Sequence, residues 1–467
     1  MITRQLLDHT VERALDYLES LPERPVVARA DVGELRDALG GPLPEAGEEA
    51  IEVIRRLADG AEPGLVSSAG PRYFGFVVGG SLPAALAADW LTSAWDQNGA
   101  LSVMSPALSV VEETAARWLL ELFGLPETAG VGFTTGAQMA TFVGLAAARH
   151  AVLARVGWDV ERRGLHGAPE IRILLAEESH VTVRVALRML GLGDETLLAV
   201  AVDGQGRMRP EALEEVLSAG GGPAIVCSEA GNVNSGAFDP LAEIAEICRR
   251  HGAWHHVDGA FGLWAAASPR LAPLVRGLAW ADSWTTDAHK WLNVPYDCGV
   301  AIVADAEAHH AAMTSSASYL IRQEGGERDG FDWVPEASRR GRAFSVWAAL
   351  AHLGRSGVAS LIERCCDLAT RFAERLGGHD GVEIVNDVVS NQVLVRFLGD
   401  AEGSSDRLTD EVVSRLQAEG TCWAGGSAWR GRRVLRLSVS NWSTTEEDID
   451  RSADAILAIW DQVRGAP

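Results

Sequence analysis

Apolar positions recur at helical spacing within the first sixty residues of the chain. Neighbouring members of each set lie three to five residues apart, which places them on one face of a helix. The positions are Leu6, Val11, Leu15 and Leu18, followed by Ile51, Ile54 and Leu57. A connection rich in Gly and Pro at residues 40–44 separates the two stretches and breaks any helix there. We therefore expect an N-terminal helical segment over residues 1–65.

The middle of the chain alternates short apolar runs with amphipathic stretches. Runs at residues 171–175, 224–227 and 254–257 are each soon followed by acidic, Ser or Gly residues, and residues 241–250 have helical periodicity. Strands that alternate with helices at this spacing predict βαβ units and a mainly parallel sheet. Ligands of such sheets gather at the carboxyl ends of the strands. Asp258 follows one of these strands, so we expect it near a ligand.

The remainder of the chain predicts a smaller α+β domain. A polar segment at residues 323–332 reads as a loop, and a helix is expected to begin near Ala343. Further predicted helices cover residues 358–376, 406–418 and 445–463, and predicted strands cover 382–385, 392–397 and 434–439. The pattern predicts an α/β fold with a large domain at residues 66–335 and a small domain at 336–467.

Composition narrows the possible partners and the compartment. The net charge of −23 argues against nucleic acid and anionic membrane surfaces, which basic patches usually bind. No apolar run approaches the roughly 18–20 residues of a membrane span, and the first residues lack the layout of a signal peptide. The six cysteines have no disulfide or metal spacing. We expect a cytoplasmic protein without a metal site.

Lys290 is the only lysine among 41 Lys and Arg residues. A bias that replaces lysine by arginine on surfaces would spare a position where the amine itself reacts. Arginine stays protonated, whereas a lysine amine can attack a carbonyl and form a Schiff base. The alternative is a lysine left by chance. As a Schiff-base residue, Lys290 needs a carbonyl partner, which could be a sugar, a keto acid or pyridoxal phosphate.

Three further features favour the cofactor. Residues 132–139 are rich in small and hydroxyl side chains and precede a helical run, so backbone N–H groups there can hold a phosphate, although a plain helix cap reads the same way. Asp258 can pair with a pyridinium nitrogen, or simply cap its strand. His180, after another strand, can stack on a flat ring, or be an ordinary surface or core histidine.

The segment around Lys290 resembles a known family. Residues 287–292 (Asp-Ala-His-Lys-Trp-Leu), residues 338–340 (Ser-Arg-Arg) and residues 435–441 are similar to the pyridoxal-phosphate-dependent decarboxylases of the aromatic-amino-acid and glutamate type. The resemblance covers residues 71–456. It implies fold-type I, the aspartate-aminotransferase fold, with pyridoxal 5'-phosphate as cofactor. It also implies decarboxylation of an L-amino acid and a homodimer with shared active sites.

The resemblance assigns roles to individual residues. Lys290 forms the Schiff base, Asp258 pairs with the ring nitrogen, and His180 stacks on the ring opposite Ala260. The phosphate is held by Thr135, Gly136, Ala137, Thr286 and His289. Tyr319 matches a loop tyrosine that protonates the substrate Cα after carbon dioxide leaves; the alternative is an ordinary loop tyrosine.

Substrate contacts are implied less directly. Arg436 is a candidate for binding the substrate carboxylate, with an inter-domain salt bridge as the alternative. Tyr73, Phe76 and Asn98 lie in segments implied to enter the active site of the other subunit. Residues 232–233 are Asn-Val where many relatives carry hydroxyls, and Asp287 replaces an Asn common in animal aromatic decarboxylases.

Other outcomes on the same scaffold remain open. The alternatives are a decarboxylative oxidative deaminase, a β-eliminating lyase or an aldolase. A catalytically silent relative that only binds the cofactor is a further alternative, and the intact set of Lys290, Asp258, His180 and Tyr319 argues against it.

Overall fold

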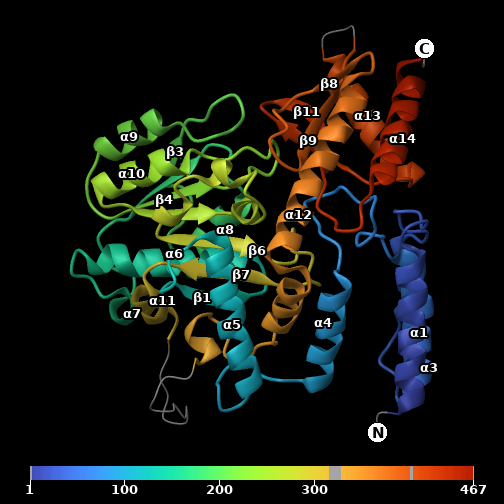
Figure 1. Ribbon diagram of the computed structural model, residues 1–467, viewed down its shortest axis with the longest axis horizontal. Helices are drawn as coiled ribbons and strands as arrows, with labels where there is room; N and C mark the ends of the chain where they lie inside the picture. Colours follow the sequence, from blue (N-terminus) through green and yellow to red (C-terminus); the bar gives the residue numbers. More distant parts are fainter. Residues whose placement is uncertain (1–2, 315–327, 400–402, 466–467) are drawn as a thin grey trace. The chain divides into compact units, whose positions relative to one another are not determined.

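A seven-stranded sheet organises the larger of two units into which the chain divides (Figure 1). The computed structural model describes residues 3–314, 328–399 and 403–465. The larger unit comprises Gly79–Thr370 with Asn386–Val393. The smaller unit combines Met1–Val78, Arg371–Val385 and Leu394–Pro467.

The large sheet is mainly parallel, as the sequence predicts. Its strands are β1 (Gly130–Thr134), β2 (Arg172–Ala176), β3 (Leu198–Val200), β4 (Ala224–Glu229), β5 (Trp254–Asp258), β6 (Ser283–Asp287) and β7 (Gly299–Val303). They lie in the order β1-β7-β6-β5-β4-β2-β3. Strands β3, β2, β4, β5 and β6 pair in parallel, whereas β7 is antiparallel to both β1 and β6. The carboxyl ends of β4, β5 and β6 therefore meet at one edge.

Helices cover both faces of this sheet. Its main helices are α4 (Pro83–Trp95), α5 (Pro106–Phe123), α6 (Ala137–Ala154), α7 (Val160–Arg163), α8 (Val181–Met189), α9 (Pro210–Ser218), α10 (Leu241–His251) and α11 (Ala306–Met313). Figure 1 shows α9 and α10 on one face and α6 on the other. Strand β4 alternates accordingly: Ile225 packs into the core on the α6 side and Val226 into the core on the α10 side. Burial on both faces explains why β4 is a continuous apolar run.

The smaller unit contains a four-stranded sheet in the order β10-β11-β9-β8. Its strands are β8 (Val382–Ile384), β9 (Gln392–Phe397), β10 (Gly425–Trp429) and β11 (Arg432–Ser438). Its helices are α1 (Arg4–Ser20), α2 (Val32–Leu39), α3 (Ala50–Ala61), α13 (Ser404–Glu419) and α14 (Glu446–Arg464). Helix α12 (Ala343–Gly377) starts in the larger unit and ends in the smaller one, and Gly354 interrupts its helical geometry with a φ of 61°.

Most predicted elements of the core are confirmed to within a residue or two, but several strands were missed. Strands β2, β4 and β5 and helix α10 match the predicted ranges. Strands β1, β3, β6 and β7 were not predicted: β1 and β6 carry Gly, Ser or Thr residues where an apolar run was sought, β3 has only three residues, and the apolar run of β7 was overlooked. The division at residues 65 and 335 stays a prediction. No helix among the described residues combines the length and apolar composition needed to cross a membrane.

Thr445 closes the N-terminus of α14 with a reciprocal capping box. Its hydroxyl accepts from Asp448 N at 3.2 Å, and the Asp448 carboxylate accepts from Thr445 N at 3.0 Å. We expect Thr445→Ala to lower the free energy of unfolding by about 1 kcal/mol, because the backbone N–H of Asp448 loses its acceptor. Denaturant unfolding measures this loss. Thr445→Ser should retain the cap, and equal losses in both variants would contradict the capping role.

Candidate active site at the carboxyl ends of the parallel strands

Acidic side chains end the three central strands of the large sheet. Glu229 ends β4 and pairs in register with Asp258, the last residue of β5, while Asp287 ends β6. All three are buried. Because β4, β5 and β6 are parallel, the carboxyl groups collect at one edge of the sheet, where ligands of such folds bind. The predicted residues Lys290 and His180 follow β6 and β2 in the same unit.

Lys290 pairs with Asp287 one turn before it. The distance from Lys290 Nζ to Asp287 Oδ2 is 3.0 Å, and the lysine side chain is 22 % exposed against 3 % for the aspartate. The other oxygen, Asp287 Oδ1, accepts from Ala137 N at 2.5 Å and lies 3.6 Å from His289 Nε2. One carboxylate thus connects the lysine to the start of α6. The sequence marked Asp287 only as a departure and did not reveal this role.

The backbone at Lys290 is held by close packing. A Cβ on Gly79 would lie 1.9 Å from the Lys290 carbonyl oxygen, so only glycine fits there. Asn293 N donates to the same carbonyl at 3.2 Å, and the Asn293 side chain accepts from Gly80 N at 2.6 Å. These contacts fix the position from which the lysine side chain extends.

Asp258 is a buried carboxylate that calls for a cationic partner. Burial raises its pKa, and the charges of His180 and Lys290 offset part of that rise. One oxygen accepts from Ala260 N at 3.1 Å. A protonated ring nitrogen is a partner of the kind such a carboxylate needs, because it brings both a charge and an N–H donor. Asp258 and Ala260 therefore fit a pyridinium ring.

His180 is held by a residue that the sequence did not reveal. Its backbone N donates to Glu229 Oε1 at 2.7 Å, and its Nδ1 lies 2.7 Å from Thr182 Oγ1. Asn232 Nδ2 donates to Glu229 Oε2 at 3.0 Å. Burial and the nearby carboxyl group of Asp258 raise the pKa of Glu229 well above its usual range. Glu229 ends a buried strand, as Asp258 does, and this position was the feature of the sequence that could have identified it.

The start of α6 fits a phosphate. Gly136 precedes the first turn and has no capping side chain of its own, and Asp287 Oδ1 accepts from the first N–H of the turn, that of Ala137. The other backbone N–H groups of the turn point outward, as at any helix N-terminus that binds an anion. His289 Nδ1 accepts from Cys298 N at 3.1 Å, so a neutral ring carries its proton on Nε2, and burial lowers its pKa. Thr135 is exposed beside this turn, whereas buried Thr286 donates its hydroxyl to Ala260 O at 3.4 Å.

A buried ion cluster supports strand β1, which leads into this turn. Arg339 donates to Gly99 O at 2.9 Å and to Phe133 O at 3.2 Å, and its Nη2 lies 2.6 Å from Glu112 Oε1. Arg328 donates to Val131 O and lies 3.7 Å from Glu112 Oε2. Since β1 is an edge strand, the two guanidinium groups satisfy carbonyl oxygens that no neighbouring strand reaches.

Three predicted substrate residues gather in the smaller unit. Tyr73 and Phe76 both stack on Trp423, with ring centroids 5.1 and 5.5 Å apart. Arg436 Nη2 donates to Phe76 O at 3.5 Å, and burial lowers the pKa of Arg436. Phe76 has a φ of 61°, which is rare for a residue other than glycine and marks a strained segment.

The remaining predicted residues lie elsewhere or outside the description. Asn98 belongs to the larger unit, where its side chain accepts from Ala100 N at 3.0 Å and approaches Ser338 Oγ at 3.5 Å. Tyr319 lies outside the described residues.

Comparisons with known proteins agree with this geometry. The family described as "Pyridoxal-dependent decarboxylase conserved domain" matches residues 33–398. The chain is 30 % identical to an acidic amino acid decarboxylase of Bos taurus, covering 97 % of this chain and 88 % of that protein. It is 26 % identical to a phenylacetaldehyde synthase of Arabidopsis thaliana, covering 94 % and 92 %.

A solved structure resembles the whole chain closely. It is the crystal structure of Oryza sativa TDC with PLP and tryptamine, with a TM-score of 0.93 and 26 % identity over 99 % of this chain and 98 % of that one. The fold-type I architecture is therefore confirmed, and the carboxylate and phosphate positions fit the expected cofactor. The chain belongs to the pyridoxal-dependent decarboxylase family and is a pyridoxal-phosphate-dependent carboxy-lyase.

Proposed function

We propose that this enzyme converts an L-amino acid to the corresponding amine, with Lys290 as the residue that binds pyridoxal phosphate covalently. One observation carries the proposal: the only lysine of the chain lies 3.0 Å from a buried carboxylate at the sheet edge where Asp258 also ends its strand. An amine at that edge is available to a carbonyl, and no second lysine can replace it.

We assign the cofactor contacts to the residues named from the sequence. The turn at Gly136 and Ala137, with Thr135, Thr286 and His289, would hold the phosphate, although the Ala137 N–H itself donates to Asp287 Oδ1. Asp258 would hold the proton of the ring nitrogen, and His180 and Ala260 would cover the two faces of the ring. When bound, the cofactor supplies an electron sink for the bonds of the substrate Cα.

Each protein group then has a defined task. Asp287 neutralises and orients the Lys290 ammonium, and it can accept a proton when the amine is needed in its neutral form. Glu229 fixes the backbone of His180 and so would position the imidazole to contact the cofactor ring. Asp258 is buried, and an unpaired buried carboxylate raises the free energy of the folded protein. The Asp258 carboxylate would therefore favour the protonated form of the ring nitrogen that it pairs with.

Substrate recognition is proposed for residues outside that edge. Arg436 can bind a carboxylate with two parallel N–H donors, and Tyr73, Phe76 and Asn98 are candidates to contact the side chain. Tyr319 is proposed to deliver a proton to Cα after carbon dioxide leaves.

An oxidative outcome is the second candidate, because one relative is named a phenylacetaldehyde synthase. In that reaction molecular oxygen is reduced to hydrogen peroxide while the substrate yields an aldehyde, ammonia and carbon dioxide. β-Elimination and aldol cleavage release no carbon dioxide. Assays for carbon dioxide, amine, aldehyde and peroxide over the common amino acids separate these outcomes.

A homodimer in the cytoplasm is also proposed. Apolar side chains on α1 and α3 are exposed, among them Leu7 at 54 % and Leu57 at 53 %, and neither helix has a buried residue. Apolar helix faces of this kind are typical of a surface covered by a partner. All six cysteines are free and buried, which suits a reducing compartment.

Removal of the lysine tests the central assignment. We expect Lys290→Ala and Lys290→Arg to lose the absorbance of the protein–cofactor Schiff base and to lower kcat on the order of 10³-fold or more, because neither side chain offers a reactive amine. Borohydride reduction followed by mass spectrometry should attach the cofactor to wild type at Lys290 only. Full activity in either variant would refute the assignment.

Arg339 tests how the phosphate turn is supported. We expect Arg339→Lys to weaken cofactor binding about tenfold while kcat at saturating cofactor changes little, because one ammonium cannot reach three acceptors in place of a planar guanidinium. Spectroscopic titration of the apoenzyme with pyridoxal phosphate measures the Kd. Arg340→Lys is the matched control, since Arg340 is exposed and pairs with Asp89 at 2.8 Å. Equal Kd values for both variants would exclude a specific role for Arg339.

Tyr319 tests the fate of the decarboxylated substrate. We expect Tyr319→Phe to lower amine formation and to raise the aldehyde and peroxide, because the phenol that would protonate Cα is gone. The product ratio, measured by mass spectrometry and a peroxide assay, reports the change. Tyr17→Phe in α1 serves as the control substitution of a tyrosine to which no role in the reaction is assigned. A product ratio unchanged in Tyr319→Phe would remove this tyrosine from the mechanism.

A further inference from the structure

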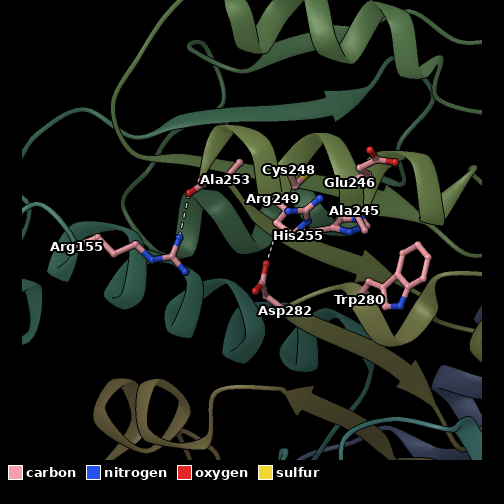
Figure 2. Close-up of a pocket in the computed structure, with 10 residues that line it drawn as sticks. Arg155, Ala245, Glu246, Cys248, Arg249, Ala253, His255, Trp280 and Asp282 are labelled. Atoms are coloured by element: carbon pink, nitrogen blue, oxygen red, sulfur yellow. Dashed lines mark hydrogen bonds between the residues drawn. The ribbon is translucent and has the colours of Figure 1, made fainter.

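A second cavity lies at the edge of the large sheet opposite Lys290. Its volume is about 710 Å³, and Figure 2 shows the side chains around it. The lining comes from Arg155 after α6, from α10, from the turn before β5, from Trp280 in the 3₁₀ turn Leu278–Trp280, and from Asp282 before β6. Strands β5 and β6 begin here and end at Asp258 and Asp287, so this cavity is distinct from the active site.

Charges of both signs line the cavity, and Glu246 already pairs with Arg250 outside it at 3.3 Å. Arg155 and Asp282 both face it, yet no ion pair joins them in the part of the chain that the structure describes. Arg155 donates one N–H to Gly252 O at 3.0 Å, and Asp282 Oδ2 accepts from His255 N at 2.7 Å. Among the described residues, the remaining guanidinium donors of Arg155 and Asp282 Oδ1 have no partner within hydrogen-bond distance.

An exposed tryptophan and a buried histidine also line the cavity. The Trp280 indole is 66 % exposed, and Figure 2 shows it and Arg155 on opposite sides of the cavity. His255, only 1 % exposed, bonds Ser228 Oγ through Nε2 at 2.7 Å, while its Nδ1 has no hydrogen-bond partner among the described residues. Burial lowers the pKa of His255 to about 3, so this ring is neutral and its free nitrogen is a polar atom without a charge.

We propose that this cavity is a second amino-acid site, which binds a free α-amino acid with an aromatic or large apolar side chain. Its carboxylate binds the Arg155 guanidinium, its ammonium binds Asp282, and its side chain packs on the Trp280 indole. The volume lies within the range of roughly 300–1,000 Å³ typical of small-molecule sites.

The mixed lining selects a zwitterion over ligands of one sign. A plain anion attracted by Arg155 and Arg249 would also meet the carboxylates of Asp282 and Glu246. A plain amine attracted by those carboxylates would meet the two guanidinium groups. A zwitterion can pair with the guanidinium groups and the carboxylates at the same time. Ligands of a single charge are disfavoured because they also meet side chains of their own sign.

Binding to holoenzyme reduced with borohydride tests the proposal, because reduction leaves no Schiff base to exchange with an amino acid. Calorimetry with L-phenylalanine is expected to detect one site per chain. Phenethylamine, which lacks the carboxylate, and 3-phenylpropionate, which lacks the ammonium, should each bind at least about tenfold more weakly. Binding of all three with equal affinity, or of none of them, would overturn the proposal.

Substitutions of lining residues test whether L-phenylalanine binds in this cavity. Arg155→Gln and Asp282→Asn keep one hydrogen-bonding group each and are expected to weaken L-phenylalanine at least about tenfold. Trp280→Ala changes an exposed side chain, so it should fold normally and weaken binding about fivefold. Arg276→Gln is the matched control, because Arg276 lies outside the lining and pairs with Glu243, which does not line the cavity either. L-phenylalanine affinity unchanged in the three lining variants would place the ligand elsewhere and refute the assignment.

Discussion

Three carboxyl groups buried at one edge of a sheet are the constraint on which the rest of this site depends. Parallel pairing brings Glu229, Asp258 and Asp287 to the same edge, and burial raises the pKa values of the first two. Carboxyl groups in that position cannot all stay ionised without cations or donors close by. The backbone N–H of His180, the start of α6 and the Lys290 ammonium supply part of what is needed. A cofactor with a protonated ring nitrogen would supply a further positive charge and a further hydrogen-bond donor.

The requirements of this site explain why Lys290 is retained in a chain that otherwise uses arginine. Where a cation must bridge several fixed acceptors, as Arg339 does between Gly99, Phe133 and Glu112, the planar guanidinium is the better group. In the role proposed for Lys290 the requirement is different, because the cation must also be able to lose its proton and form a covalent bond. Arginine can meet the electrostatic part of that requirement but not the chemical part.

The sequence could predict those features that depend on local pattern. Strand β4 was found because both of its faces are buried, which leaves a continuous apolar run, and β5 was found although His255 and His256 stand between its apolar residues. Strand β6 reads Ser-Trp-Thr-Thr-Asp and was missed, because its hydroxyl side chains are satisfied by partners that lie on other elements, such as Ala260 O for Thr286. Glu229 and the pairing of Asp287 with Ala137 were missed for the same reason. The register between strands that are far apart in the chain cannot be predicted from the sequence of either strand alone.

The residues proposed to recognise the cofactor and those proposed to choose the substrate belong to different parts of this chain. Lys290, Asp258 and His180 belong to the larger unit and concern groups common to every amino acid. Arg436, Tyr73 and Phe76 belong to the smaller unit, where two aromatic rings stack on Trp423 and the backbone of Phe76 is strained. Substitutions in that stack can alter what is bound without disturbing the buried carboxylates. Such a separation lets one fold serve relatives named for acidic substrates and for aromatic products alike.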